Sequence, residues 1–396
     1  MTFIDQQVDI TTDFEPEEDA PIPTREIRYR RAILLVVAYA VSIAVALGLS
    51  AILIAATNHS PHDAFEALYT GSLKTRGAWG RTIEQAGPLL LVALGSVIAN
   101  RAGVFNIGQE GQVLIGAFAG TLVALKVPGP HHLILVLTLI AAFAGGAAWA
   151  GIAAGLNIWR GLNVVITTLL LIFIAQEFVQ FAVTRAWFLQ QSNALGIASP
   201  QSDIIAPGLH MPVIGSPPKF YLQSGFLVAL GFTIIVAFLL ARTRWGFRLK
   251  MLGHNPNAAR HAGVSVVAVG GAALLISGGF AGLAGGVLLT STVFSLQPAM
   301  ANNVGWEGLL VALVARNRPV AVVFVALFFG ALRAGGGFLT TTGVPSYLVD
   351  VIQAFMVLAT LFPPMFMSWL DRRRVRRAAA PRRVPTTPVP EIAPAR

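Results

Sequence analysis

Long apolar stretches without a single charge restrict what this chain can fold into more than any other feature. Residues 32–56 contain no charged side chain. As a helix, this stretch alone is long enough to cross a hydrocarbon core of about 30 Å. Only 12% of the 396 residues are charged, about half of the roughly 25% that is usual in a soluble domain. A soluble fold would lack polar surface, so the sequence predicts an all-α, polytopic membrane protein.

About ten transmembrane helices can be placed along the chain. They are predicted at residues 32–56, 87–101, 110–126, 132–157, 163–183, 223–242, 264–290, 305–316, 319–335 and 346–369. The second and the eighth are short for a bilayer. These two spans therefore need polar or broken ends, or burial inside a bundle of helices.

The distribution of basic residues predicts the orientation of these spans. An even number of spans places both termini on one side of the membrane. If that side is the cytoplasm, 21 of the 28 lysines and arginines lie inside and seven lie outside, as the positive-inside rule predicts. We therefore expect a disordered acidic cytoplasmic tail at 1–24, a transmembrane permease domain at 25–370 and a basic cytoplasmic tail at 371–396.

Several classes of function are disfavoured by what the sequence lacks. The chain has no cysteine, and it shows neither a metal-ligand cluster nor a catalytic Ser/His/Asp set. It has no phosphate-binding P-loop motif, so any ATP must be bound by a separate subunit. The net charge of +10 lies in short runs between and after the apolar spans, which argues against nucleic acid as a partner. We expect no enzyme activity, no metal and no cofactor.

A polar, glycine-rich segment separates the second and third predicted spans. Residues 100–112 read NRAGVFNIGQEGQ and contain Asn106, Gln109, Glu110 and Gln112. Such side chains are costly next to lipid, and interrupted backbone at membrane depth needs burial in protein or a water-filled cavity. One interpretation is an ordinary cytoplasmic turn, and the other is a broken helix that lines a pathway. The fifth span adds three polar residues, Asn163, Thr167 and Thr168.

The loop 243–264, with the sequence TRWGFRLKMLGHNPNAARHAGV, predicts a short helix outside the membrane. Asn255 suits the N-cap and Pro256 the first helical position. Gly263 suits the position just after the helix. A helix of two turns is marginal alone, so it must pack on something. Lipid or the chain itself could be that surface, and a cytoplasmic partner is the alternative.

Glycines spaced by four residues predict close helix packing in two places. The seventh span carries Gly278, Gly282 and Gly286, and the fourth carries Gly151 and Gly155. This spacing places the glycines on one helix face and lets two backbones approach each other closely.

Four of these segments together resemble a known family. GVFNIGQEGQVLIGA (103–117), GLNVVITTLLLIFIA (161–175), the loop 243–264 and SGGFAGLAGG (277–286) are similar to the permease subunits of bacterial ABC importers. The closest branch transports nucleosides and simple sugars, within the family that includes ribose and branched-chain amino acid permeases. The resemblance covers about residues 30–370.

The resemblance implies a fold and a set of partners. Two inverted halves would surround a central cavity in the bacterial inner membrane. The chain would work with a second copy or a paralogous permease, with cytoplasmic ATP-binding subunits, and with an extracytoplasmic protein that delivers a small-molecule solute. The segment 103–112 would line the pathway, and the loop would couple to the ATPase. The matching loop positions are Gly253, Asn255, Pro256, Ala258, Ala259, Arg260 and Gly263.

Three interpretations of the function remain open at this point. A nucleoside importer is the leading one, and an importer of a simple sugar such as a pentose or galactoside is the alternative within the same class. The third is a self-sufficient, ion-coupled secondary transporter. That class needs charged residues within the spans, for which Glu177 and Asp350 are the candidates.

Overall fold

The computed structural model describes residues 25–192, 200–216, 219–340 and 346–378. The described residues are almost entirely helical and include one short β-hairpin. The α-helices are α1 (Arg25–Ala56), α2 (Pro61–Tyr69), α3 (Arg76–Arg101), α4 (Gln109–Lys126), α5 (His131–Arg160), α6 (Val164–Thr184), α7 (Ser224–Arg242), α8 (Arg244–His254), α9 (Pro256–His261), α10 (Val266–Leu288), α11 (Val304–Val314), α12 (Pro319–Thr340) and α13 (Ser346–Ala378). The acidic segment 1–24 and the end of the basic tail lie outside the described residues.

The described chain divides into two units. Residues 53–351 form the first unit, and the second contains residues 25–52 and 352–378, which are most of α1 and α13. The apolar stretch Ile33–Ala56 of α1 is only 11% buried, as expected for a helix surrounded by lipid.

The all-α membrane class is confirmed, because each of the ten predicted spans corresponds to a helix. Within the described residues, seven helices are long and apolar enough to cross a bilayer, namely α1, α3, α5, α6, α7, α10 and α12. The remaining three predicted spans correspond to α4, to the short helix α11 and to the apolar part of α13.

The second span was predicted too short. The expected stretch began at residue 87, but α3 begins at Arg76. Its first turns carry charges whose partners belong to the protein. The Arg81 guanidinium donates to the Gly71 carbonyl oxygen at 3.3 Å, and the Tyr221 hydroxyl donates to the Glu84 carboxylate at 3.0 Å. A hydropathy pattern cannot detect polar groups that are satisfied in this way.

The last helix extends beyond the predicted end of the last span. The transmembrane domain was expected to end at residue 370 and a basic tail to begin at 371. Helix α13 continues to Ala378, so the first arginines of the expected tail belong to the last helix.

Helix α10 is the central helix of the first unit and packs against α3, α4 and α5. The predicted glycine stripe on it is confirmed. A Cβ atom on Gly282 would overlap the Ala142 carbonyl oxygen and lie 2.8 Å from the Gly146 Cα. A Cβ on Gly116 of α4 would overlap the backbone of Gly282. Three helices therefore cross at one point where no side chain fits.

The expectation for Gly151 and Gly155 on α5 was wrong within the described chain. A Cβ atom on either residue would meet no heavy atom within 4 Å. The contact stripe of α5 lies on another face, through Ala142, Gly146 and Ala150, all of which are buried. Alanines and glycines occur on more than one face of this helix, so spacing alone did not identify the buried face.

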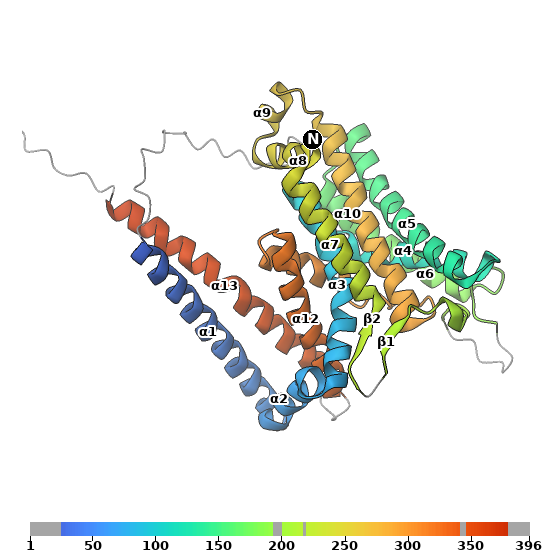
Figure 1. Ribbon diagram of the computed structural model, residues 1–396, viewed down its shortest axis with the longest axis horizontal. Helices are drawn as coiled ribbons and strands as arrows, with labels where there is room; N and C mark the ends of the chain where they lie inside the picture. Colours follow the sequence, from blue (N-terminus) through green and yellow to red (C-terminus); the bar gives the residue numbers. More distant parts are fainter. Residues whose placement is uncertain (1–24, 193–199, 217–218, 341–345, 379–396) are drawn as a thin grey trace, which may run out of the picture. The chain divides into compact units, whose positions relative to one another are not determined.

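The first unit has two opposite ends, which are named here after the short helices that lie there, the α9 end and the α2 end (Figure 1). At the α2 end, the connection before α7 pairs with the residues that follow α10. Ser202 N donates to Leu296 O at 3.0 Å, and Met211 N donates to Thr290 O at 2.8 Å. The connection also includes a 3-10 turn (Pro207–Leu209) and the hairpin β1 (Val213–Gly215) and β2 (Tyr221–Gln223), with Val213 opposite Gln223. Burial, and then the Glu84 carboxylate, raise the pKa of the Tyr221 hydroxyl, which therefore remains a donor at neutral pH.

Candidate functional site

The polar segment between α3 and α4 returns into the bundle instead of turning at its end. Gln109, the first residue of α4, donates from Nε2 to the Val92 carbonyl oxygen at 3.2 Å. Val92 precedes Arg101, the last residue of α3, by about 14 Å of helix. Gly103 turns the chain back with a φ of +72°. The segment is a broken helix, and α4 begins beside Val92, about two-thirds of the way along α3.

A second break follows α10, which is extended by a π turn (Leu289–Val293). The chain returns through residues 294–303, and α11 begins at Val304. A Cβ atom on Gly308 would overlap the Val92 side chain, so the second turn of α11 packs against the same part of α3 as the start of α4 does. The first break enters from the α9 end and the second from the α2 end, which is the relation that inverted halves require.

The amide side chains of the first break are hydrogen-bonded to each other and to α10. Asn106 Nδ2 donates to Gln112 Oε1 at 2.8 Å and to Ser277 Oγ at 3.0 Å. Gln112 Nε2 donates in return to Asn106 Oδ1 at 3.1 Å. Gln109 Oε1 accepts from Ser96 Oγ at 2.7 Å. All five side chains are buried, with 1% exposure or less.

Glu110 joins the two breaks. Its carboxylate accepts from the Asn303 amide at 2.8 Å and from the Gly305 amide at 2.7 Å. These amides lie at the start of α11, where backbone donors have no partner within the helix. A carboxylate there also interacts favourably with the helix dipole. Glu110 is only 5% exposed and therefore acts as a buried cap supplied by another helix.

A nearly buried ion pair that the sequence did not predict lies beside this cap. Arg333 of α12 donates to Glu307 Oε1 at 2.9 Å, and both side chains are almost buried. Arg333 also donates to the Asn302 carbonyl oxygen at 3.0 Å. Residue type and spacing do not link Glu307 with Arg333, which are 26 residues apart in the chain. Their pairing becomes visible once α11 and α12 are placed side by side.

The three polar residues of α6 are satisfied locally. Asn163 caps the helix by accepting from the Val165 amide at 2.8 Å, and the Thr167 hydroxyl donates to the Asn163 carbonyl oxygen at 2.8 Å. Thr168 alone reaches the break, because a Cβ atom on Gly108 would lie 2.8 Å from the Thr168 Cβ.

The predicted pathway residues therefore fall into separate groups. Asn106, Gln109 and Gln112 form one buried cluster, and Glu110 lies beside it at the start of α11. Asn163 and Thr167 lie apart from both. Because the cluster is buried, contact with a solute requires its hydrogen bonds to exchange partners. Its role in a pathway stays a prediction.

The loop between α7 and α10 contains the expected short helix. Helix α9 begins at Pro256 after the N-cap Asn255, whose Oδ1 accepts from the Ala258 amide at 3.0 Å. Gly263 follows its end with a φ of +76°. Ala259 is buried, whereas Ala258 and Arg260 are exposed. The preceding helix α8 was not predicted. Its basic side chains are exposed, and Leu249 and Leu252 are buried beneath it.

The loop is in direct contact with the first break through Gly253. A Cβ atom on this glycine would overlap the Arg101 carbonyl oxygen and lie 3.1 Å from the Gly103 amide nitrogen. The same turn is tied to the connection between α11 and α12. Asn100 Nδ2 donates to Asn317 Oδ1 at 3.0 Å, and the Arg101 guanidinium donates to the Asn317 carbonyl oxygen at 3.1 and 3.2 Å.

Three relatives, all of them named as ABC transporter permease proteins, match most of the chain. The chain is 32% identical to the glucose ABC transporter permease protein TsgB13 of Haloferax volcanii, over 83% of this chain and 89% of the relative. It is 31% identical to the guanosine ABC transporter permease protein NupP of Bacillus subtilis, over 80% and 90%. It is 29% identical to the nucleoside ABC transporter permease protein NupB of Lactococcus lactis, over 78% and 86%.

No solved structure matches the chain. The sequence profile of the family described as branched-chain amino acid transport system / permease component matches residues 80–361, which include both breaks and the loop with α9. The chain therefore belongs to this family of membrane permeases, whose members are transport subunits and not enzymes.

Proposed function

We propose that the chain is the membrane-spanning subunit of an ATP-driven nucleoside importer in a bacterial inner membrane. The observation that carries the ATP-driven part is α9, an exposed and doubly capped helix on a loop that contacts the end of α3 through Gly253. The nucleoside part is supported by two relatives whose names specify guanosine and nucleosides.

The proposal assigns partners to both ends of the bundle. The α9 end faces the cytoplasm, as do both chain termini, and cytoplasmic ATP-binding subunits contact α9. These subunits bind the ATP, and this chain needs no cofactor. A second copy or a paralogous permease completes the pathway through the lipid bilayer, and an extracytoplasmic binding protein delivers the small-molecule solute at the α2 end.

Uptake into proteoliposomes tests this function. Vesicles that contain the chain, its ATP-binding subunit and trapped ATP are expected to accumulate labelled guanosine when the loaded binding protein is added outside. Vesicles with the chain alone and an ion gradient are expected to accumulate none, because the chain has no P-loop and needs the separate motor. Accumulation by the chain alone would favour an ion-coupled secondary transporter.

A simple sugar is the second candidate for the solute. The observation that favours it is the relative named for glucose, which matches over 83% of this chain. The same vesicles distinguish the candidates when labelled glucose, a pentose or a galactoside replaces guanosine. ATP-dependent uptake of the sugar, with none of guanosine, would replace the nucleoside assignment and leave the importer class unchanged.

Substitutions in α9 test the docking role. Ala258 is exposed and Ala259 is buried, so an aspartate has different effects at the two positions. Ala258→Asp is expected to abolish co-purification of the ATP-binding subunit without changing the Tm of the permease. Ala259→Asp is expected to disrupt α9 itself and also lose the partner. Ala206→Asp, at an exposed position of the α2 end, is the matched control. Normal co-purification of the Ala258→Asp protein would exclude docking through this surface.

A further inference from the structure

Helix α6 is covered on one side only. It packs against α4 and α5 through a buried face that includes Thr168, Ile172, Ala175 and Val179. Its opposite face has no cover among the described residues. The large apolar side chains there are 42–59% exposed, and they are Ile166, Leu170, Phe173, Ile174 and Phe181.

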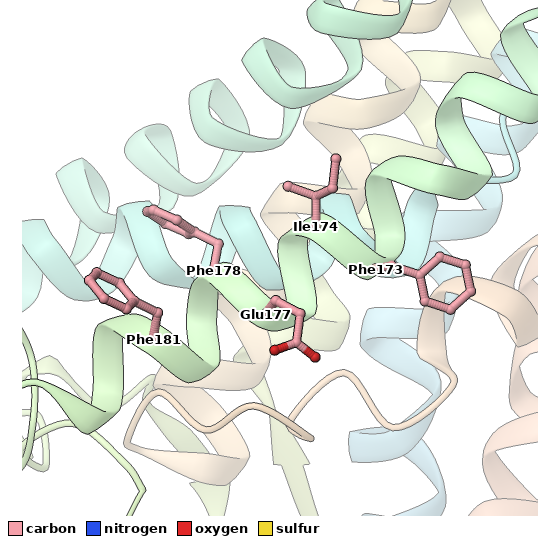
Figure 2. Close-up of a pocket in the computed structure, with 5 residues that line it drawn as sticks. All are labelled: Phe173, Ile174, Glu177, Phe178 and Phe181. Atoms are coloured by element: carbon pink, nitrogen blue, oxygen red, sulfur yellow. The ribbon is translucent and has the colours of Figure 1, made fainter.

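Glu177 lies in the middle of this open face. Phe173 precedes it by one helical turn and Phe181 follows it by one turn, so the three side chains share a face. In Figure 2 the carboxylate points away from the helix axis, between Phe173 and Phe181 along the helix. These residues, with Ile174 and Phe178, line an open hollow of about 580 Å³. No hydrogen bond or ion pair reaches the carboxylate from the described residues.

The position of this carboxylate indicates a polar partner. Residue 177 is two-thirds of the way along α6, which is one of the helices long and apolar enough to span a bilayer. A carboxylate at that depth is costly against lipid and marks a partner, a pathway or a ligand site. The five lining residues all belong to α6, so the hollow is an open face of one helix that is apolar around the carboxylate.

We propose that Glu177, Phe173 and Phe181 form a solute-contact site in the transport pathway. This inference rests on the proposed function. The site would take a neutral ring compound with two adjacent hydroxyl groups. Both hydroxyls donate to the carboxylate, which accepts two hydrogen bonds at once. The ring of the solute lies against a phenyl face. The ribose of a nucleoside and a simple sugar share this chemistry. The 177 position is nearer the α2 end than the α9 end of α6, as an early contact with incoming solute requires.

Transport by Glu177 variants tests the site in the complete complex of permease, ATP-binding subunit and binding protein. Glu177→Ala is expected to lower guanosine uptake about tenfold or more, because two charge-assisted hydrogen bonds are lost. Glu177→Gln keeps one acceptor oxygen and is expected to lose less. Phe173→Ala is expected to lose about fivefold. Phe238→Ala on α7 is the matched control, since Phe238 is 61% exposed and Phe173 is 59% exposed.

A comparison of guanosine with 2′-deoxyguanosine isolates the hydroxyl contact. The parent complex is expected to favour guanosine more strongly than the Glu177→Ala complex does. The binding protein is the same in both, so a change in this ratio belongs to the permease. The same comparison is made with labelled glucose. If the parent complex takes up glucose but no guanosine, and Glu177→Ala loses the glucose uptake, the occupant of the site is a sugar.

Two results would overturn the site while leaving the proposed function intact. The first is parent-level uptake and an unchanged ratio in Glu177→Ala. The second is loss of the assembled complex on size-exclusion chromatography, which would show that Glu177 contacts a second permease. Failure of the parent complex to transport either guanosine or glucose is a separate outcome, because it contradicts the proposed function before any variant is compared.

Discussion

Gly282→Val is expected to prevent the bundle from assembling. A side chain at this position has no space, because even a Cβ atom would overlap the Ala142 carbonyl oxygen. The obstacle is backbone, which cannot rotate away as a side chain can. Overpacking of a closely packed core typically costs about 1–3 kcal/mol, and separating α10 from both α4 and α5 would cost more. We expect an aggregated or unstable protein and no transport.

Gly151→Val is the matched control for this substitution. It places the same side chain on α5, where a Cβ atom meets nothing within 4 Å. The Gly151→Val protein should therefore keep the Tm and the monodisperse elution profile of the parent in detergent. If Gly282→Val behaves in the same way, the three-helix crossing is not a tight contact.

Loss of the Glu110 carboxylate is the second substitution with a large expected effect. Glu110→Ala leaves the Asn303 and Gly305 amides buried without their acceptor. Hydrogen bonds to a charged group are worth about 1.5–3 kcal/mol each. We therefore expect a loss of about 3 kcal/mol or more, a clearly lower Tm and no measurable uptake. Glu110→Gln retains one acceptor oxygen and should be intermediate.

A surface glutamate provides the control for Glu110. Glu66 forms an exposed ion pair with Lys74 at 3.0 Å, and such pairs contribute about 0–1 kcal/mol. Glu66→Ala should therefore leave Tm and uptake close to the parent values. An equal effect of Glu66→Ala and Glu110→Ala would contradict the role of Glu110 as a buried cap.

The sequence predicted those parts of the fold whose residues are close neighbours in the chain. The cap of α9 needs only Asn255, Pro256 and Gly263, which lie within nine residues of one another. The first break could be predicted for the same reason, because its polar residues and its glycines are neighbours. The number of spans followed from apolar stretches, each of which is continuous in the chain.

The parts that could not be predicted depend on partners far away in the sequence. Residues 76–86 belong to α3 although they carry Arg81 and Glu84, whose partners are Gly71 and Tyr221. The cap of α11 is a carboxylate almost two hundred residues earlier in the chain. Residue type and spacing contain no information about such pairs until the helices are arranged.

For the candidate site as well, the sequence predicted the types of residue but not their contacts. The residue types of the amide cluster indicated a polar interior, but they did not indicate that Asn106 and Gln112 bond to each other. Glu177 was noted as a charge within a span. Its position on the uncovered face of α6 became visible only when α4 and α5 were seen to cover the other face.

The close approach of Gly253 to Arg101 has a mechanical consequence. The two backbones are already as near as atoms allow, so α8 cannot move toward α3 without displacing the turn at Arg101. That turn is hydrogen-bonded to Asn317, which follows the end of α11. The two helices that start inside the bundle are α4 and α11, and non-helical backbone connects each of them to this turn or to Asn317. A force on the loop that carries α8 and α9 therefore reaches both helices through the contact between Gly253 and Arg101. The two helices can then move together without strain spread over the rest of the bundle.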